Sequence, residues 1–266
     1  MDKEMLFDGK KIFYRVYGDG KKVMLVHGFG EMGDVWKNQV DFFKEKVQLI
    51  VPDLPGSGQS EMIKDMSMEG MAEVLKAIID KESSPTPPLG GWGVIGHSMG
   101  GYIALAFAEK YPELLHSLGL FHSSAFADNE EKKATRRKGI EFIKEHGAIE
   151  FLKNTSPNLF SPNTKVENQQ LVNDFIAGLN NFSPEALVSY YEAMMQRPDR
   201  TEILKKSTIP VLFIMGKHDN AIPLEDGLKL CHLSGKSYID ILNKSGHMGM
   251  IEEPTESNSA LEKFLI

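Results

Sequence analysis

The stretch GHSMGG at residues 96–101 contains a G-x-S-x-G pattern. An apolar run precedes it at 92–95, and apolar residues recur at helical spacing over 103–111. A sharp turn between a strand and a helix holds a serine in a strained conformation, with its hydroxyl clear of the sheet edge. The glycines suit this turn because a Cβ atom at position 96 or 100 would clash where strand and helix pass closely. The stretch therefore predicts a nucleophilic serine, Ser98.

Outward from this turn, apolar runs alternate with helical patterns. The start of the chain predicts a hairpin around the turn Asp8-Gly9. Helical spacing recurs at 68–78 and near the C-terminal end, as well as at 103–111. The alternation predicts an α/β fold, a mostly parallel sheet with helices on both faces. The expected buried strands are 23–26, 47–51, 92–95, 118–121 and 209–215, and a further strand is expected at 238–242.

The region from about residue 123 to residue 200 contains no buried-strand pattern. Its segments have the mixed polar and apolar pattern of helices, as in IEFIK at 140–144. We therefore predict one core, made of residues 1–122 and 201–266, with a helical insertion at 123–200. Within the core, the stretch KESSPTPP at residues 81–88 predicts a short stiff loop.

Two later segments supply partners for Ser98, which needs a base because a serine hydroxyl alone is a poor nucleophile. Asp219 follows the strand at 209–215, and His247 follows the strand at 238–242. The order Ser, Asp, His is typical of one arrangement of the catalytic triad. It predicts that Ser98 attacks, that His247 takes and returns the proton, and that Asp219 orients the imidazole.

The loop HGFGEMG at residues 27–33 fits two interpretations. Its glycines let backbone N–H groups turn toward the serine, which predicts an oxyanion hole formed by the backbone N–H groups of Phe29 and Met99. Its G-x-G-x-x-G spacing, with Asp53 about 20 residues further on, is also the outline of a dinucleotide-binding turn. The second interpretation leaves Ser98 and its two partners unexplained.

The composition narrows the choice of partners. The 266 residues include 30 basic and 37 acidic residues, and the formal net charge of −7 favours neither nucleic acid nor an anionic membrane as a partner. We expect no cofactor and no metal, because H-x-x-x-H and C-x-x-C patterns are absent. The single cysteine excludes an internal disulfide, and no signal-peptide pattern is visible at the start of the chain. We therefore expect a cytoplasmic location.

Together these motifs resemble the α/β-hydrolase superfamily, and the match runs nearly end to end. In detail the chain is similar to small, capped serine carboxylesterases and lactonases. The resemblance implies an eight-stranded, mostly parallel sheet, a helical cap at 123–200 over the site, and a structural role for Asp53 in its turn. The matching segments are HGFG at 27–30, DLPGSGQS at 53–60, GHSMGG at 96–101, Gly216 with Asp219 and Pro223, and Gly246-His247.

The resemblance implies a carboxylic-ester hydrolase that cleaves a small-molecule ester or lactone through an acyl-enzyme. Met32, His122 and Met248 are expected to line the substrate pocket, and an adaptable wall of thioethers predicts a small or medium apolar acyl group. Arg197 either closes the cap against the sheet or binds a substrate carboxylate. Two alternatives stay open, a ligand-sensing signalling protein of the same fold with slow hydrolysis and a cofactor-free perhydrolase or acyltransferase.

Overall fold

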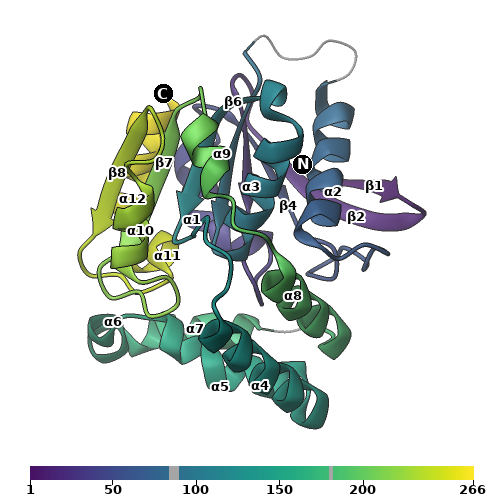
Figure 1. Ribbon diagram of the computed structural model, residues 1–266, viewed down its shortest axis with the longest axis vertical. Helices are drawn as coiled ribbons and strands as arrows, with labels where there is room; N and C mark the ends of the chain where they lie inside the picture. Colours follow the sequence, from purple (N-terminus) through teal and green to yellow (C-terminus); the bar gives the residue numbers. More distant parts are fainter. Residues whose placement is uncertain (84–89, 180–181) are drawn as a thin grey trace.

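A single eight-stranded sheet runs through the centre of the protein (Figure 1). The computed structural model describes residues 1–83, 90–179 and 182–266. The predicted loop at 81–88 is wrong over 81–83, which form the end of a helix, and its remaining residues lie outside the described ones. The order across the sheet is β1-β2-β4-β3-β5-β6-β7-β8. The strands are β1 (Asp2–Phe7), β2 (Lys10–Tyr17), β3 (Lys22–Val26), β4 (Gln48–Pro52), β5 (Trp92–His97), β6 (Leu115–Phe121), β7 (Val211–Gly216) and β8 (Ser237–Leu242).

The strand directions confirm the predicted α/β fold. Strand β2 pairs antiparallel with both β1 and β4, whereas the pairs from β4 through β3, β5, β6 and β7 to β8 are all parallel. Strand β7 begins at Val211 instead of residue 209, because Pro210 has no N–H group to donate to a neighbouring strand. The carbonyl of Pro210 still accepts from the amide of Leu118 at 3.1 Å, within the range of an ordinary sheet bond.

Successive strand residues face two different helical layers. In β3, Val23 and Leu25 pack on the side of α1 (Lys37–Phe43) and α12 (Pro254–Leu265). Met24 and Val26 pack on the other side, with α2 (Met68–Ser83) and α3 (Met99–Lys110). This is the alternation expected of a strand buried on both faces.

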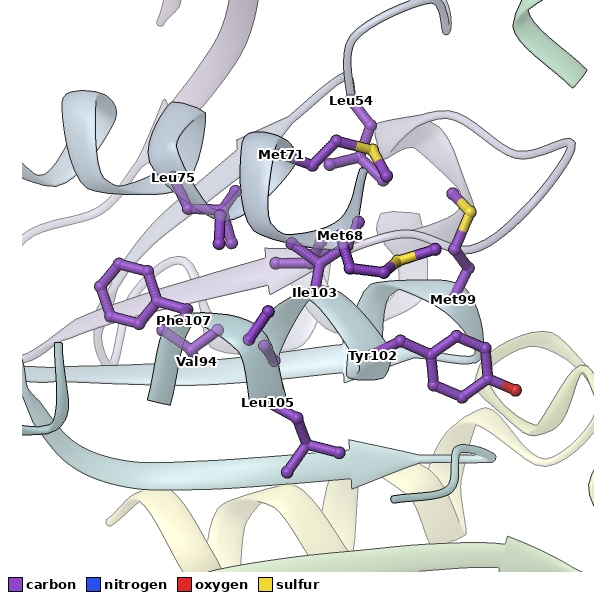
Figure 2. Packing of buried hydrophobic residues seen from close by; sticks show 14 of the residues in the cluster. Leu54, Met68, Met71, Leu75, Val94, Met99, Tyr102, Ile103, Leu105 and Phe107 are labelled. Carbon is purple, nitrogen blue, oxygen red and sulfur yellow. The ribbon is translucent and has the colours of Figure 1, made fainter. Parts of the chain in front are cut away.

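Helix α2 turns one apolar stripe toward α3 and the sheet. Met68, Met71 and Leu75 recur at helical spacing and are fully buried. Figure 2 shows these side chains gathered above Ile103 and Phe107 of α3. This packing fixes the start of α3, and so the position of the turn that precedes it.

Of the helices between β6 and β7, those within residues 130–196 gather beyond the carboxyl ends of the parallel strands, whereas the last, at 201–206, lies beside α3 (Figure 1). Four of these helices begin at a side chain that caps the first turn, Asn129, Ser161, Asn168 and Ser183. The division of the chain into a core and a cap stays a prediction. The helices are α4 (Glu130–His146), α5 (Ala148–Thr155), α6 (Pro162–Glu167), α7 (Gln169–Gly178), α8 (Pro184–Gln196) and α9 (Thr201–Lys206), with the 3₁₀ turn η3 (Ser156–Leu159).

Four shorter elements complete the described chain. They are the 3₁₀ turns η1 (Gly33–Trp36) and η2 (Pro112–Leu114) and the helices α10 (Leu224–Leu230) and α11 (Gly249–Glu252).

Across the described residues, no helix combines the length and the apolar character needed to cross a bilayer.

Candidate active site

The loops after five adjacent strands meet at the carboxyl edge of the sheet. Strands β3, β5, β6, β7 and β8 are neighbours and run parallel, so their carboxyl ends face the same edge. Ligands of open α/β sheets bind at this edge. The residues that directly follow these strands include, in sheet order, Phe29, Ser98, His122, Asp219 and His247.

Ser98 occupies the strained turn that the sequence predicts. Its backbone has φ 51° and ψ −116°, and its amide donates to the carbonyl oxygen of Phe121 at 3.0 Å. A Cβ atom at Gly96 would overlap the backbone of Gly100, and one at Gly101 would overlap the side chain of Ser123. The turn therefore requires glycine on both sides of the serine, and it leaves Ser98 partly exposed.

Asp219 is a carboxylate whose two oxygens are both fully engaged. Oδ1 accepts from the amides of Ala221 at 2.8 Å and Ile222 at 2.9 Å. Oδ2 lies 2.8 Å from Nδ1 of His247 and 3.0 Å from Nδ1 of His122. Burial alone would raise the pKa of Asp219, but the two imidazoles hold it well below its usual range. The carboxylate is therefore ionised and acts only as an acceptor.

His247 is held by its backbone as well as by its ring. Its amide donates to the carbonyl of Leu159 at 2.6 Å, and its carbonyl lies 2.9 Å from Nε2 of His97. Glu252 accepts from the amides on either side, those of Gly246 and Met248. Burial works against protonation of His247, yet the charge and hydrogen bond of Asp219 raise its pKa above the ordinary value.

A buried Glu31 that the sequence analysis did not single out links the Ser98 turn to the 27–33 loop. Its Oε2 accepts from the amide of Gly28 at 2.7 Å and lies 3.0 Å from Nδ1 of His97. Burial favours the protonated form of Glu31, but the nearby His97 lowers the pKa of this carboxyl group below its ordinary value. Through His97, this carboxylate is connected to the backbone of His247. The sequence signal for Glu31 was a charged residue inside an otherwise apolar, glycine-rich loop.

The 27–33 loop lies against the nucleophile turn. A Cβ atom added at Gly28 would lie 3.1 Å from Cβ of Ser98. Among the described residues, no acceptor is found for the amide N–H of Phe29 or of Met99. Both amides are therefore available to an oxyanion, but their role stays a prediction.

Both carboxylate oxygens of Asp53 already have hydrogen-bond partners around its turn. Its Oδ1 accepts from the amide of Gly33 at 2.9 Å and pairs with Nη1 of Arg15 at 2.9 Å. Its Oδ2 accepts from the amide of Gln59 at 3.0 Å. A ribose-binding carboxylate would have to release these partners, so the geometry disfavours the dinucleotide interpretation of the loop.

A cavity of about 550 Å³ lies between the carboxyl edge and the helices α4, α5, α7 and α8. Ser98 and His247 both line it. Within the described part of the chain, no hydrogen bond joins the Ser98 hydroxyl to His247. The other lining residues are Phe29, Gly30, Glu31, Tyr102, Asn129, Glu131, Lys132, Thr135, Arg136, Leu152, Thr155, Ser156, Leu159, Phe175, Tyr191, Met194, Asn220, Ala221, Ile222, Pro223 and Asp226.

The walls of this cavity differ from the predicted pocket, because none of Met32, His122 and Met248 lines it. Met248 is completely buried and packs with the apolar layer under the sheet edge, and Met32 packs against the opposite layer. His122 turns inward to Asp219. Adjacency in sequence to a site residue did not determine which way these side chains point.

Arg197 joins the end of α8 to the loop before α4 and to Tyr102 of α3. Nη1 pairs with Oδ1 of the buried Asp128 at 2.9 Å, and Nη2 donates to the carbonyl of Phe126 at 3.0 Å. The guanidinium lies 3.8 Å from the ring centroid of Tyr102. Its carboxylate partner belongs to this chain, which favours the first of the two predicted roles.

His122, Asp219 and His247 are also the group that, among the described residues, could hold a metal ion. Their potential ligand atoms lie within 4.8 Å of one another. Nδ1 of each imidazole, however, is hydrogen-bonded to the carboxylate, so an ion between them would have to replace both hydrogen bonds.

Comparison with known proteins agrees with the fold. The family model described as α/β hydrolase fold matches residues 21–139. A thermophilic esterase from Thermogutta terrifontis superposes with a TM-score of 0.90 at 28% identity, over 100% of this chain and 98% of that one.

Two curated relatives match at lower identity. Protein ABHD8 from Bos taurus is 25% identical over 92% of this chain, which spans only 56% of the relative's length. A 2-hydroxy-6-oxo-6-(2'-aminophenyl)hexa-2,4-dienoic acid hydrolase from Metapseudomonas resinovorans is 23% identical, over 97% of this chain and 88% of that protein. With this sheet and these matches, the chain has the α/β-hydrolase fold.

Proposed function

We propose that this protein is a serine hydrolase that cleaves a carboxylic ester or lactone through an acyl-enzyme. The observation that carries the proposal is the hydrogen bond of 2.8 Å between Asp219 and His247, at a cavity that His247 shares with the strained Ser98. The Thermogutta terrifontis esterase and the Metapseudomonas resinovorans hydrolase support it as relatives.

In the proposed acylation, the three side chains have separate roles. The ionised Asp219 fixes the proton of His247 on Nδ1, which leaves Nε2 as the basic nitrogen. Nε2 takes the proton of the Ser98 hydroxyl as its oxygen attacks the substrate carbonyl. The imidazolium is stabilised by the buried carboxylate, and its proton then passes to the departing alkoxide.

The amides of Phe29 and Met99 are the proposed donors to the tetrahedral oxyanion. Preorganised donors of this kind stabilise charge that develops only in the transition state. Water then enters the cavity, and His247 removes its proton as it attacks the acyl-enzyme. The acid departs, and Ser98 recovers its hydroxyl proton.

The substrate is proposed to lie between a core and a cap. Residues 123–200 would form the cap over the core of 1–122 and 201–266, because helices α4, α5, α7 and α8 supply cavity walls. A volume of about 550 Å³ suits a small or medium acyl group. The apolar side chains on the wall include Phe29, Leu152 and Met194, whereas Asn129, Thr135 and Asn220 add polar groups.

The test is hydrolysis of p-nitrophenyl esters from acetate to decanoate by the wild type and by Ser98→Ala. We expect a chain-length optimum in the wild type and a loss of kcat on the order of 10⁶-fold in the variant. Ser237→Ala is the matched control, because its hydroxyl has no partner among the described residues and it lies at the amino end of β8. Equal rates in all three proteins would contradict the proposal.

A sensing protein of the same fold would give a different result in this assay. It would release one equivalent of p-nitrophenol and then turn over slowly. A perhydrolase or acyltransferase would accelerate when a peroxide or alcohol is added, because that co-substrate replaces water at the acyl-enzyme.

A further inference from the structure

His122 is a buried side chain in a site shaped to fit it. It follows β6 with φ 47°, a left-handed conformation that is rare for residues other than glycine. Its ring lies where Gly216 and Gly249 leave room. A Cβ atom at Gly216 would lie 2.7 Å from Cε1 of the ring, and one at Gly249 would overlap Nε2. No larger residue at either position fits beside this ring.

The surroundings of the ring fix its tautomer. Nδ1 lies 3.0 Å from Oδ2 of Asp219, an acceptor that carries no proton. Nε2 is buried and has no hydrogen-bond partner among the described residues. The proton of a neutral ring therefore lies on Nδ1. Burial lowers the pKa of His122 to about 4, so the ring is neutral at pH 7.

Asp219 consequently serves two imidazoles with one oxygen. His122 and His247 reach Oδ2 from different strand ends, and their ring centroids are 5.7 Å apart. A neutral N–H donor stabilises the carboxylate charge and limits its swing about the Cβ–Cγ bond. It also draws electron density from Oδ2, which weakens the pull of that oxygen on the His247 proton.

We propose that His122 is a positioning residue that holds Asp219 against His247 and restrains the basicity of His247. The kinetic part of this proposal rests on the proposed serine-hydrolase function. His122 touches neither the cavity nor Ser98 in the described structure, so it acts only through the carboxylate.

Other ionisable groups also act on His247. His97 lies 4.8 Å away between ring centroids, with Glu31 on its far side. Glu252 of α11 accepts from the amides that flank His247. All three groups remain in every variant below, so a change in the titration of His247 reports on His122.

Three variants separate the effect of the N–H donor of His122 from the effect of the volume of its ring. His122→Phe keeps a ring and removes the N–H donor. His122→Asn places an amide N–H near the position of Nδ1 and tolerates the positive φ. His116→Phe is the matched control, because this histidine lies at the other end of the same strand and its Nε2 is likewise unpartnered.

The readout is the pH profile of kcat and kcat/KM for p-nitrophenyl ester hydrolysis. In His122→Phe we expect the acid-limb midpoint to rise by about half a pH unit and kcat to fall about tenfold, with little change in KM. His122→Asn and His116→Phe should retain the wild-type midpoint. An unchanged midpoint in His122→Phe, or an equal shift in His122→Asn, overturns the proposal.

The tautomer of His122 tests the same arrangement without a kinetic assay. Nitrogen NMR of histidine-labelled wild type, assigned with His122→Asn, should show His122 protonated on Nδ1 and neutral from pH 7 to pH 5. A proton on Nε2, or a charged ring at pH 7, overturns the proposal even if His122→Phe fails to fold. Absence of esterase activity in the wild type would instead contradict the proposed function and leave this NMR test decisive.

Discussion

The carboxylate of Asp219 holds the imidazole of His247 through a single hydrogen bond of 2.8 Å from Nδ1 to Oδ2. The two residues follow adjacent parallel strands, β7 and β8, whose register places both loops at one edge. The Asp219 side chain is 1% exposed, so water does not compete for this bond. The proposed chemistry depends on this pairing, because it fixes which nitrogen of His247 can act as a base.

Replacing Asp219 with asparagine should lower kcat by about 10⁴-fold, because an amide favours the wrong tautomer of the imidazole. Asp226→Asn is the control, since this residue lines the same cavity but pairs with Lys229 and not with a histidine. Steady-state kinetics and circular dichroism on both variants make the measurement. A loss of less than tenfold in folded Asp219→Asn contradicts the pairing's proposed role.

The pH profile of the wild type should reflect the raised pKa of His247. Its value lies above the ordinary 6.5, since the charge of Asp219 outweighs burial. As pH falls through this pKa the imidazole gains a proton and can no longer accept one from serine. We therefore expect kcat/KM to be half-maximal above pH 6.5 and to fall on the acid side. A midpoint of the acid limb below pH 6.5, measured at constant ionic strength, would contradict this prediction.

Gly96, two residues before Ser98, should contribute strongly to stability. A Cβ atom at Gly96 would overlap the backbone of Gly100, which cannot move without displacing α3. We expect Gly96→Ala to lower the free energy of unfolding by about 3 kcal/mol. Gly178→Ala is the control, because nothing lies within 4 Å of its Cβ position. Urea unfolding measures both, and equal stability of the two variants would refute the close approach.

The ion cluster of Asp128 with Arg136 and Arg197 should stabilise the helical region. The Asp128 carboxylate is fully buried between the two arginines. Breaking a buried ion pair costs about 3 kcal/mol, so we expect Asp128→Asn to lower the free energy of unfolding by that amount at pH 7. Burial opposes ionisation, but the two arginines lower the pKa of Asp128. Its contribution is therefore complete above the ordinary pKa of 3.8 and is lost as pH falls through the lower folded value.

Urea unfolding of Asp128→Asn and wild type at a series of pH values checks this dependence. The exposed Asp41, which pairs with Lys37, gives the control Asp41→Asn, whose stability should barely change. A stability difference between Asp128→Asn and wild type that persists unchanged to the lowest pH would rule out ionic stabilisation at this position.

The sheet could be predicted from the sequence because its signal is local. Runs such as 23–26 and 92–95 are apolar without interruption, and only a parallel strand buried on both faces tolerates that pattern. Strand ends were less certain. The start of β7 depends on Pro210, and the start of β6 at Leu115 includes two polar residues, His116 and Ser117.

The carboxyl-edge residues were predictable as a set, but their contacts were not. Parallel strands bring the loops of Ser98, Asp219 and His247 together whatever the helices do. Whether His122 points to the cavity or to Asp219 depends on a φ of 47° and on two glycines distant in sequence. The cavity walls depend on how helices α4, α5, α7 and α8 pack, and a residue's neighbours along the chain carry no information about that packing.

Labelling with an alkyl fluorophosphonate, followed by peptide mass spectrometry, tests the central proposal most directly. The reagent phosphonylates an activated serine, so the account predicts one equivalent bound to Ser98, with loss of ester hydrolysis in parallel. Labelling should be absent in Ser98→Ala and much slower in Asp219→Asn. Attachment at any other residue, or full hydrolytic activity after complete labelling of Ser98, would contradict the proposed serine nucleophile.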